Sequence, residues 1–371
     1  MIFIAAAAIA LVFDPGCLAD LRRAATASGV AVTIFDSATA GFTIDSTIVA
    51  ARNHQPEFTT PIWDYLALLV DEQRIGDGTE RLAEWDAVLA SVEKTSGVDR
   101  HTIVAVWGVE SDFGRIMGQR PLVRSLATGY CLGRRPKFFR DQLVATLQII
   151  QRGDIPPDRL VGSWAGAFGQ TQFMPTTFLR LAVDADGDGR RDIVGSVPDA
   201  LGSTANYLKQ HGWVPGAPWG YEVRVPARYR GRTGRHYRQP VARWAAAGFR
   251  RIGGRAVTGK GSAALLLPAG RHGPAFLVFR NFDVIYSYNA AESYALAIAH
   301  LADRLRGAPA FVAPWPTDDR GLSRAERREV QEQLKTRDAI SGFQARVGLP
   351  VSGRAGGRVL DSLRVTRVPP S

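Results

Sequence analysis

One glutamate, Glu110, has the setting that a general acid needs. It ends the apolar run IVAVWGVE at residues 103–110. In a helix, positions 103, 106, 107 and 110 share one face, and this apolar face should be turned toward the interior. Burial disfavours a charged carboxylate, so the pKa of Glu110 should rise and the group should stay protonated near neutral pH. The alternative is a glutamate that turns to solvent at the helix end, because Ser111 and Gly114 follow closely.

A run of alternating aspartates predicts a cation site. The residues at positions 1, 3 and 5 of a calcium-binding pattern are Asp184, Asp186 and Asp188. Glycine follows at position 6, and Arg190 stands at position 7, where such a loop supplies a backbone carbonyl oxygen. Position 12 normally holds a bidentate carboxylate but is Gly195 here, and Asp199 is the candidate replacement. A solvated acidic turn is the alternative.

Two further segments carry polar groups suited to a sugar ligand. In GSWAGAFGQTQFMPTTF at residues 162–178, glycines allow close backbone approach, while Ser163 and Gln172 offer hydrogen bonds to hydroxyl and amide groups. The same loop could simply connect two helices. In YSYNAAESYALAIAHLADRL at residues 286–305, the polar candidates are Tyr288, Asn289 and Tyr294. The alternative there is helix capping by the asparagine and core packing by the tyrosines.

The spacing of apolar residues predicts a mainly helical protein with a small β-containing part. Helices are expected at residues 17–29, 36–40, 61–71, 79–97, 100–113, 137–152, 197–211 and 291–305. Between residues 220 and 288, glycine, proline and arginine become frequent, and short apolar or alternating runs predict strands at 221–225, 264–267 and 275–279. Residues 307–320, rich in proline and polar side chains, predict a linker to a small helical C-terminal piece.

Composition narrows the class of partner. The 371 residues, 46% of them hydrophobic, are enough for one large domain and one small one. The net charge of +11 and the pI near 10.1 suit a polyanionic surface such as nucleic acid, anionic lipid or a bacterial cell wall. The absence of a helix-turn-helix, RNA-recognition or zinc-finger signature argues against nucleic acid.

The N-terminus predicts export. Residues 1–16 begin with the apolar run MIFIAAAAIALVF, which fits the core of a secretory signal and is too short to span a bilayer. A misassigned start or a buried first helix would give the same pattern. The two cysteines, Cys17 and Cys131, could form one disulfide in an exported protein or remain separate thiols, and their spacing does not decide between these outcomes.

Four ordered segments resemble the membrane-bound lytic murein transglycosylase B family, glycoside hydrolase family 103. They are VWGVESDFGRIMGQRPLVRSLAT at 106–128, the loop at 162–178, the aspartate loop running into DALGSTANYLKQHGW at 199–213, and RNFDVIYSYNAAESYALAIAHLADRL at 280–305. The resemblance covers residues 17–306. It implies a mainly α (α+β) fold with a lysozyme-like catalytic core, related to goose lysozyme, and a small β-containing subdomain.

The same resemblance assigns roles to single residues. Glu110 matches the catalytic glutamate, in an ESxYG-like motif where Phe113 replaces tyrosine. The positions that match substrate-contacting or cleft-lining residues are Ser163, Gln172, Tyr288, Asn289 and Tyr294. The aspartate loop matches an EF-hand-like cation site, from which Gly195 departs. No cofactor is expected for the chemistry, and a bound Ca²⁺ would be structural.

The implied activity is cleavage of peptidoglycan glycan strands in the periplasm, with membrane or wall association at the protein surface. Ordinary glycosidases use two carboxylates, whereas Glu110 has only Asp112 nearby, and residues two apart on a helix point to nearly opposite sides. A single acid fits a reaction in which the muramic 6-hydroxyl closes onto C1 and leaves a 1,6-anhydro end. A noncatalytic wall-binding protein and a hydrolytic muramidase remain the alternatives.

The C-terminal part resembles a small peptidoglycan-binding domain that has been shortened. The resemblance rests on LSRAERREVQEQLKTRDAISGFQARVGLPVSGRAGGRVLDSL at residues 322–363. It gives a domain division into residues 1–16, 17–306, 307–320 and 321–365, of which the last is a truncated binding module. A basic helical tail is the alternative.

Overall fold

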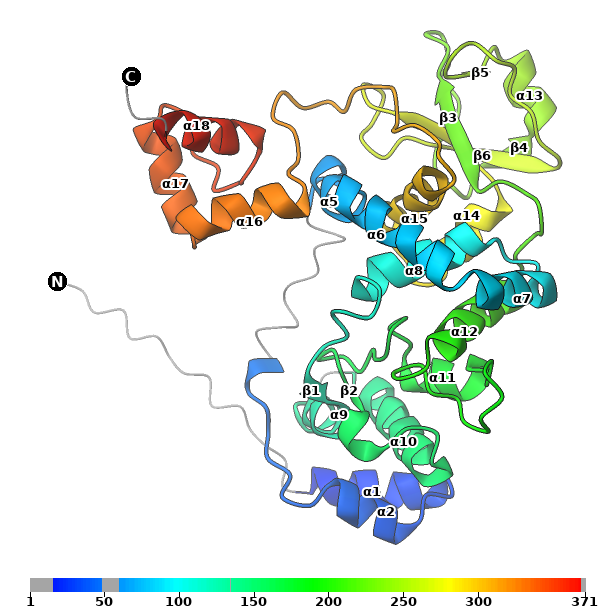
Figure 1. Cartoon of the computed structure of the whole chain (residues 1–371), viewed down its shortest axis with the longest axis vertical. Helices are drawn as coiled ribbons and strands as arrows, with labels where there is room; N and C mark the ends of the chain where they lie inside the picture. The colour runs from blue at the N-terminus through cyan, green and yellow to red at the C-terminus, as the bar shows by residue number, and fades with distance from the viewer. Residues whose placement is uncertain (1–15, 49–59, 134, 368–371) are drawn as a thin grey trace. The chain divides into compact units, whose positions relative to one another are not determined.

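The computed structural model describes residues 16–48, 60–133 and 135–367 (Figure 1). These residues are mainly helical with a small antiparallel sheet, which confirms the predicted fold class. Residues 1–15 of the predicted signal lie outside the described residues. None of the helices within the described ranges is long and apolar enough to cross a membrane.

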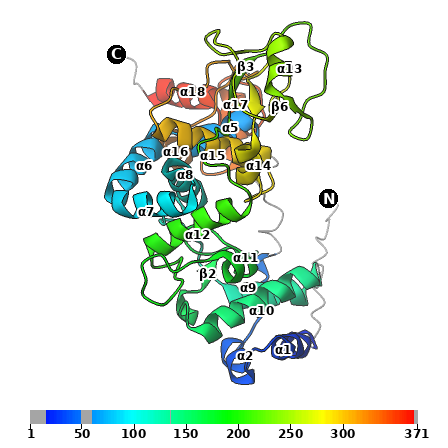
Figure 2. The ribbon, with the colours of Figure 1, turned by 90° about the vertical axis from the view of Figure 1, so that its right-hand side faces the viewer.

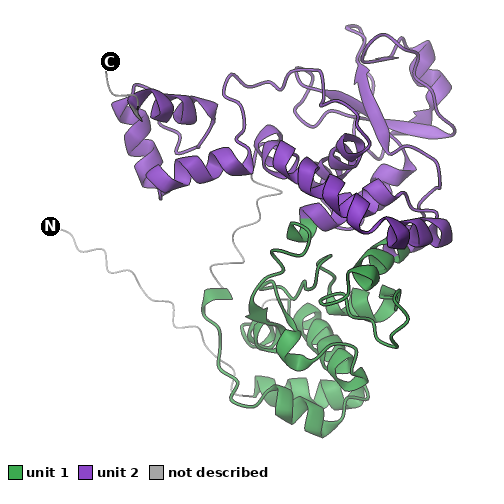
Figure 3. Cartoon of the chain, viewed as in Figure 1, with its two compact units in different colours: residues 1–54, 110–206 green, residues 55–109, 207–371 purple. Residues whose placement is uncertain are grey.

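The chain forms two compact units, each built from two separate segments (Figure 3). Unit 1 comprises Met1–His54 and Glu110–Asn206, and unit 2 comprises Gln55–Val109 and Tyr207–Ser371. The predicted division into residues 1–16, 17–306, 307–320 and 321–365 stays a prediction, because the two compact units do not test it.

Unit 1 is built on a cluster of helices. Its elements are α1 (Cys17–Ala27), α2 (Val32–Ala38), α9 (Leu122–Cys131), α10 (Pro136–Arg152), η1 (Pro157–Arg159) and α11 (Pro175–Leu181). Helices α1, α9 and α10 pack together, as both views show (Figure 2). Helix α10 buries Leu143 and Leu147 completely, and a Cβ at Gly129 of α9 would lie 2.4 Å from the Phe139 ring of α10. Only glycine therefore permits this close approach.

A two-stranded sheet lies beside these helices in unit 1. Strands β1 (Arg120–Pro121) and β2 (Val161–Gly162) are antiparallel, and Gly162 also bridges to Phe168. Gly118 has φ of 87°, and a Cβ on it would meet the Gly162 carbonyl group at 2.4 Å. A Cβ on Gly162 itself would lie 2.2 Å from the Ala167 carbonyl oxygen, so backbone contact requires glycine at both positions.

A disulfide joins α1 to α9. Cys17 and Cys131 are bonded, with their Cα atoms 5.4 Å apart and a separation of 114 positions in sequence. This settles the choice that spacing left open. The bond connects the first described helix to the helix that follows β1. The covalent loop that it closes contains residues 17–54 and 110–131 of unit 1 together with residues 55–109 of unit 2.

Unit 2 contains the remaining helices and the larger sheet. Its helices before the C-terminal part are α5 (Ile62–Leu69), α6 (Glu72–Glu84), α7 (Asp86–Ser96), α14 (Arg280–Tyr286) and α15 (Glu292–Leu305), together with most of α8 (Arg100–Ser111) and the end of α12 (Val197–Gln210). The single helix predicted over residues 79–97 is wrong. The backbone leaves helical geometry at Trp85, with ψ of 22°, and this separates α6 from α7.

A five-stranded antiparallel sheet and one helix form what we call the β-subdomain (residues 220–278). The elements are β3 (Gly220–Arg224), β4 (Arg238–Pro240), α13 (Val241–Ala246), β5 (Arg250–Arg251), β6 (Ser262–Leu266) and β7 (Ala275–Val278), and the strand order is β4-β6-β7-β3-β5. Its core contains Trp244, Phe249, Leu265 and Leu277. The apolar runs predicted β3, β6 and β7, whereas α13 and the short edge strands β4 and β5 carry no such pattern.

The C-terminal helices have a core of their own. Helices α16 (Arg324–Gln333), α17 (Arg337–Arg346) and α18 (Gly357–Arg367) enclose a cluster that includes Leu322, Phe343 and Leu360. The first of these helices begins with a capping box between Ser323 and Glu326.

Ion pairs fix these helices to the rest of unit 2. Arg354 donates to both oxygens of Asp64 on α5, each at 2.6 Å, and Arg324 donates to Asp71, the N-cap of α6. Asp64 and Asp71 are 5% and 7% exposed. Because buried carboxylates need such partners, these ion pairs hold the C-terminal helices against α5 and α6.

Loss of the disulfide should destabilise unit 1 strongly. A loop of 114 residues that is no longer closed in the unfolded chain corresponds to about 4 to 5 kcal/mol. We expect the double variant Cys17→Ser/Cys131→Ser to lose this much free energy of unfolding in urea. Reductant should destabilise the natural chain similarly and leave the variant unchanged. Equal stability of the two oxidised proteins would contradict the expectation.

Acid should loosen the C-terminal helices through Glu326. The Arg320 guanidinium, which donates to both of its oxygens, and the Ser323 backbone N–H lower the pKa of Glu326 from 4.5 to about 2. The ionised form therefore stabilises the fold above about pH 4.5, and this stabilisation is lost as the pH falls toward 2. Glu326→Gln should lower the unfolding free energy at pH 6 and flatten its fall below pH 4.5. Exposed Glu332→Gln, on the same helix, should do neither.

Candidate active site and cation loop

Glu110 lies one residue before the end of α8. On the same face Ile103, Val106 and Trp107 are at most 2% exposed, as the apolar pattern predicts. The Glu110 side chain itself is half-buried, because the helix ends at Ser111 and the chain turns away from the helix axis. Apolar side chains therefore lie along the helix behind the carboxyl group, and this group remains accessible to a ligand.

The turn after Glu110 has an unusual backbone. Asp112, Phe113 and Gly114 have φ angles of 53°, 59° and 83°, three consecutive left-handed residues. In the described residues only two other non-glycine positions share this conformation, and one of them is Gln172. Left-handed conformations of ordinary residues cost free energy and persist where the surroundings impose them. The strain is thus concentrated at the two segments that the sequence singled out.

Ser111 joins the end of α8 to the loop that contains Gln172. Its hydroxyl donates to the Gln170 carbonyl oxygen and accepts the Gly114 N–H at 2.8 Å, and the side chain is 1% exposed. Gln170 is fixed on its other side, since its N–H donates to the Ile193 carbonyl oxygen at 2.9 Å. The sequence analysis assigned no role at the site to Ser111 or Gln170, although each is a polar residue inside one of the quoted motifs.

Ser163 and Gln172 lie in this loop in unit 1. The Ser163 hydroxyl oxygen accepts the Ala167 N–H at 3.0 Å, and the Gln172 amide donates to the carbonyl oxygens of Met117 and Gly169 at 3.1 and 2.8 Å. Both side chains are half-buried. Each side chain therefore holds the loop in shape while remaining partly accessible.

Asp112 is engaged elsewhere. It lies beyond the helix, and its carboxylate accepts a hydrogen bond from the Arg115 guanidinium at 3.0 Å. The expectation that Asp112 does not act as a second catalytic carboxylate stays a prediction. The observed ion pair supports it by a different route from the helical spacing used above.

The tyrosine and asparagine candidates belong to unit 2. Tyr294 is 2% exposed, and its ring stacks on that of Tyr288 with centroids 6.4 Å apart. Tyr288 also packs on Tyr207, whose hydroxyl donates to the Ser287 carbonyl oxygen at 2.7 Å. Tyr207 was not singled out from sequence. Asn289 does not cap α15, because the N-cap is Ala291 and makes no side-chain cap.

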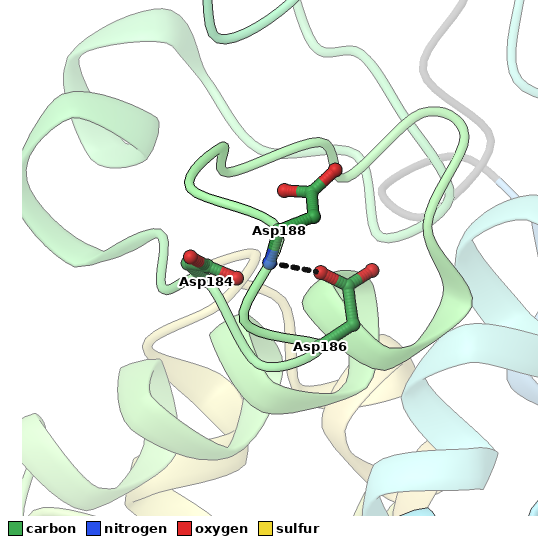
Figure 4. A group of neighbouring side chains, drawn as sticks. All are labelled: Asp184, Asp186 and Asp188. Carbon is green, nitrogen blue, oxygen red and sulfur yellow. Dashed lines mark hydrogen bonds between the residues drawn. The ribbon is translucent and has the colours of Figure 1, made fainter.

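The three alternating aspartates converge (Figure 4). The carboxylates of Asp184, Asp186 and Asp188 are exposed, and one oxygen of each lies within 4.8 Å of the others. Gly189, at loop position 6, has φ of 87°, the left-handed conformation that the sharp turn of a calcium loop requires. The donor set, three carboxylate groups on one short turn, suits a hard cation such as Ca²⁺.

Asp199 holds this loop through hydrogen bonds to its backbone. Its side chain is 0% exposed, and its oxygens accept the N–H groups of Ala185 and Asp192, each at 2.7 Å. Burial raises the pKa of Asp199. Its carboxylate is therefore occupied with backbone N–H groups of the loop and does not stand with the three converging aspartates. Arg190 donates its N–H to Asp188 at 2.8 Å.

Comparison with known proteins places this chain in a family. The family model described as a transglycosylase SLT domain matches residues 14–303. A curated relative, membrane-bound lytic murein transglycosylase B of Escherichia coli, is 29% identical over 251 residues, which are 64% of this chain. The chain spans 65% of the length of that relative.

Solved structures agree in fold. SltB3 from Pseudomonas aeruginosa, in complex with NAG-anhNAM-pentapeptide, has a TM-score of 0.79 and 44% identity, over 94% of this chain and 98% of that one. The Escherichia coli lytic transglycosylase Slt35, in complex with calcium, has a TM-score of 0.70 and 26% identity, over 79% of this chain and 93% of that one. The protein belongs to the SLT-domain lytic transglycosylase family, and the predicted family and lysozyme-like fold are confirmed.

Removing the Ser111 hydroxyl should destabilise the candidate site. In Ser111→Ala the Gly114 N–H loses its acceptor and the buried Gln170 carbonyl oxygen loses its donor, at a cost of about 1 to 3 kcal/mol. Urea unfolding measures this loss. Exposed Ser37→Ala in α2 of the same unit should cost less than about 0.5 kcal/mol. Equal effects of the two substitutions would show that Ser111 does not hold the turn.

Proposed function

We propose that this protein is a lytic transglycosylase that cleaves the bond between N-acetylmuramic acid and N-acetylglucosamine in peptidoglycan, with Glu110 as its only catalytic carboxyl group. Family membership supports the reaction class. The observation that carries the assignment of the residue is the position of Glu110 at the end of a buried helix, directly before the strained turn that Ser111 fastens to the Gln170 loop.

A single carboxyl group can serve both halves of the reaction. Glu110, in its acid form, would protonate the glycosidic oxygen as the bond breaks. The acetamido group of the muramic residue would stabilise the positive charge that develops at C1. The Glu110 carboxylate would then accept the proton of the muramic 6-hydroxyl group while the oxygen of that hydroxyl group bonds to C1. Atoms balance without water, and the product carries a 1,6-anhydromuramic end.

Substrate contacts are proposed for the half-buried polar groups of the quoted motifs. In unit 1, Ser163 and Gln172 would bind hydroxyl and amide groups of the sugars, since both side chains keep an exposed part beside their loop bonds. In unit 2, Tyr288 and Asn289 would contact the glycan, while buried Tyr294 would support Tyr288 through ring stacking. SltB3 of P. aeruginosa, whose structures contain muropeptides, supports glycan strands as the substrate class.

We propose a structural Ca²⁺ on the aspartate loop. Asp184, Asp186 and Asp188 would supply carboxylate oxygens and Arg190 its carbonyl oxygen, while Asp199 would shape the loop through its backbone bonds. With Gly195 at position 12, the site lacks the bidentate carboxylate and should bind weakly. The ion would order the loop and take no part in the reaction.

The proposed setting is the periplasm of a bacterial envelope. The disulfide is typical of an oxidising compartment, and the apolar run that begins residues 1–16 suits a secretory signal. The C-terminal helices (residues 321–365) would act as a shortened wall-binding module, joined by residues 307–320 to the catalytic part. Their docking on α5 and α6 favours a fixed position for this module.

Glu110→Gln should abolish cleavage and leave the fold intact, because the amide fills the same space and cannot donate the proton. Loss of general acid catalysis corresponds to a fall of about 10²- to 10⁴-fold. Release of soluble fragments from purified sacculi measures turnover, and a thermal melt checks folding. Asp112→Asn is the matched neighbour, and it should retain most of the turnover. A folded Glu110→Gln variant that keeps more than about a tenth of the turnover would refute the assignment.

Calcium should raise the melting temperature modestly, because an ion that binds only the folded loop stabilises it by mass action. Asp184→Ala should remove the shift, because the loop of this variant lacks one ligand of the ion and also lacks the acceptor of the Gly187 and Gly189 N–H groups. Asp188→Ala tests the ligand with less disturbance of the turn. The exposed Asp158→Ala is the control and should keep the shift. A melting temperature indifferent to saturating Ca²⁺ would leave the loop as an acidic turn.

A further inference from the structure

The β-subdomain carries a net charge equal to that of the whole protein. Its residues 220–278 include twelve lysines and arginines and a single acidic residue, Glu222, which gives +11, the net charge of the entire chain. The other residues of the protein therefore balance one another. Eleven of the twelve basic residues are arginines. The net charge of the chain thus resides in the β-subdomain of unit 2 (Figure 1), and most of its basic residues lie in the loops between the strands.

This charge is not neutralised within the described residues. Glu222 accepts the N–H groups of Val312 and Ala313 at 2.9 and 2.7 Å, so its carboxylate holds the segment after α15. Of the twelve basic side chains, only Arg235 and Arg238 are seen in ion pairs in the described part of the chain, both with Asp283. Most of the others are exposed.

Four exposed arginines gather around one anchored tyrosine. We call Arg230, Arg232, Arg243 and Arg271 the arginine cluster. Arg230 and Arg271 donate to the Tyr229 carbonyl oxygen at 3.0 and 2.8 Å. Arg232 and Arg243 line a hollow of about 650 Å³ that also contains Tyr229.

Tyr229 anchors the arginine cluster to the core of the β-subdomain, and an exposed tyrosine lies beside the cluster. The Tyr229 ring packs on Trp244 and Phe249, with centroids 5.8 and 5.0 Å apart, and this fixes the loop to the core of the β-subdomain. Tyr237 borders the same hollow, is 50% exposed, and lies under the Arg232 guanidinium at 5.2 Å. Among the residues that the structure describes, no acidic side chain lines this hollow.

We propose that the arginine cluster is a docking surface for an anionic phospholipid bilayer. Guanidinium groups bind phosphate through paired hydrogen bonds, and an exposed tyrosine suits the boundary between headgroups and acyl chains. Clusters of four or more basic residues on one surface are attracted to anionic lipids, with about a fivefold gain in affinity per charge. The proposal is independent of the proposed cleavage reaction.

A bilayer fits these observations better than two other polyanions. Nucleic acid belongs to a reducing compartment, whereas the disulfide of unit 1 indicates an oxidising one. In peptidoglycan the carboxylates of the peptide stems are partly balanced by stem amines and lie far apart. The phosphates of an anionic bilayer are closely spaced, so that four neighbouring guanidinium groups can all find a partner.

The test is sedimentation of the full chain with vesicles made of equal parts phosphatidylglycerol and phosphatidylethanolamine, at about 0.15 M salt. We expect binding to these vesicles and none to vesicles of phosphatidylcholine. The quadruple variant Arg230→Gln/Arg232→Gln/Arg243→Gln/Arg271→Gln should bind at least about 50-fold more weakly. Its melting temperature and its turnover of short soluble glycan strands should match those of the natural chain, which shows that the fold is kept.

A charge-matched control separates a local site from general attraction. Four exposed basic residues outside the β-subdomain, Arg152, Arg180, Lys335 and Arg346, are changed to glutamine together. This variant should keep its vesicle affinity within about fivefold, the effect of one surface charge. Equal losses in both quadruple variants would refute a dedicated surface. Loss of binding to purified sacculi or DNA in the cluster variant, without vesicle binding by the natural chain, would assign the surface to the wall or to nucleic acid instead.

Discussion

The hydrogen bonds of Ser111 connect the end of α8 to the loop after β2, and the geometry of the candidate site in unit 1 depends on them. The hydroxyl serves two partners, the Gln170 carbonyl oxygen and the Gly114 N–H, in a position that is almost fully closed to water. Gly114 also packs closely on this loop, because a Cβ on it would lie 2.8 Å from the Gln170 side-chain oxygen. The left-handed turn and the loop therefore hold each other in place.

This constraint explains why a half-buried glutamate can stand at a helix end. Burial of the apolar face of α8 stabilises the helix and offsets the free-energy cost of the strained turn. This turn directs the chain away from the helix axis directly after Glu110. On the other side of the loop, the Gln170 N–H donates to the Ile193 carbonyl oxygen, and the N–H of the preceding residue, Asp192, donates to the Asp199 carboxylate. Residues of the cation loop and of the candidate active site thus share one network of hydrogen bonds, between side chains and backbone and within the backbone, in unit 1.

Local pattern predicted much of this. The apolar period of residues 103–110 located α8, and the alternating aspartates located the turn on which three carboxylates converge. What sequence could not provide were pairings between distant residues. Ser111 and Gln170 are 59 positions apart, Arg354 and Asp64 are 290 apart, and neither pair follows from spacing. Asp199 was expected as a ligand, whereas in the structure it is buried and its oxygens accept backbone N–H groups. The short strands β4 and β5 carry too few residues for a period to be visible.

The central claim is that one carboxyl group, Glu110, breaks the glycan bond and then helps to form the anhydro ring. Digestion of purified sacculi by the natural chain, followed by mass spectrometry of the fragments before and after borohydride treatment, tests it most directly. The account predicts muramic ends that are one water lighter than a hydrolysis product and that borohydride leaves unchanged. Ends that borohydride reduces would show that water attacks C1, and this result would contradict the account.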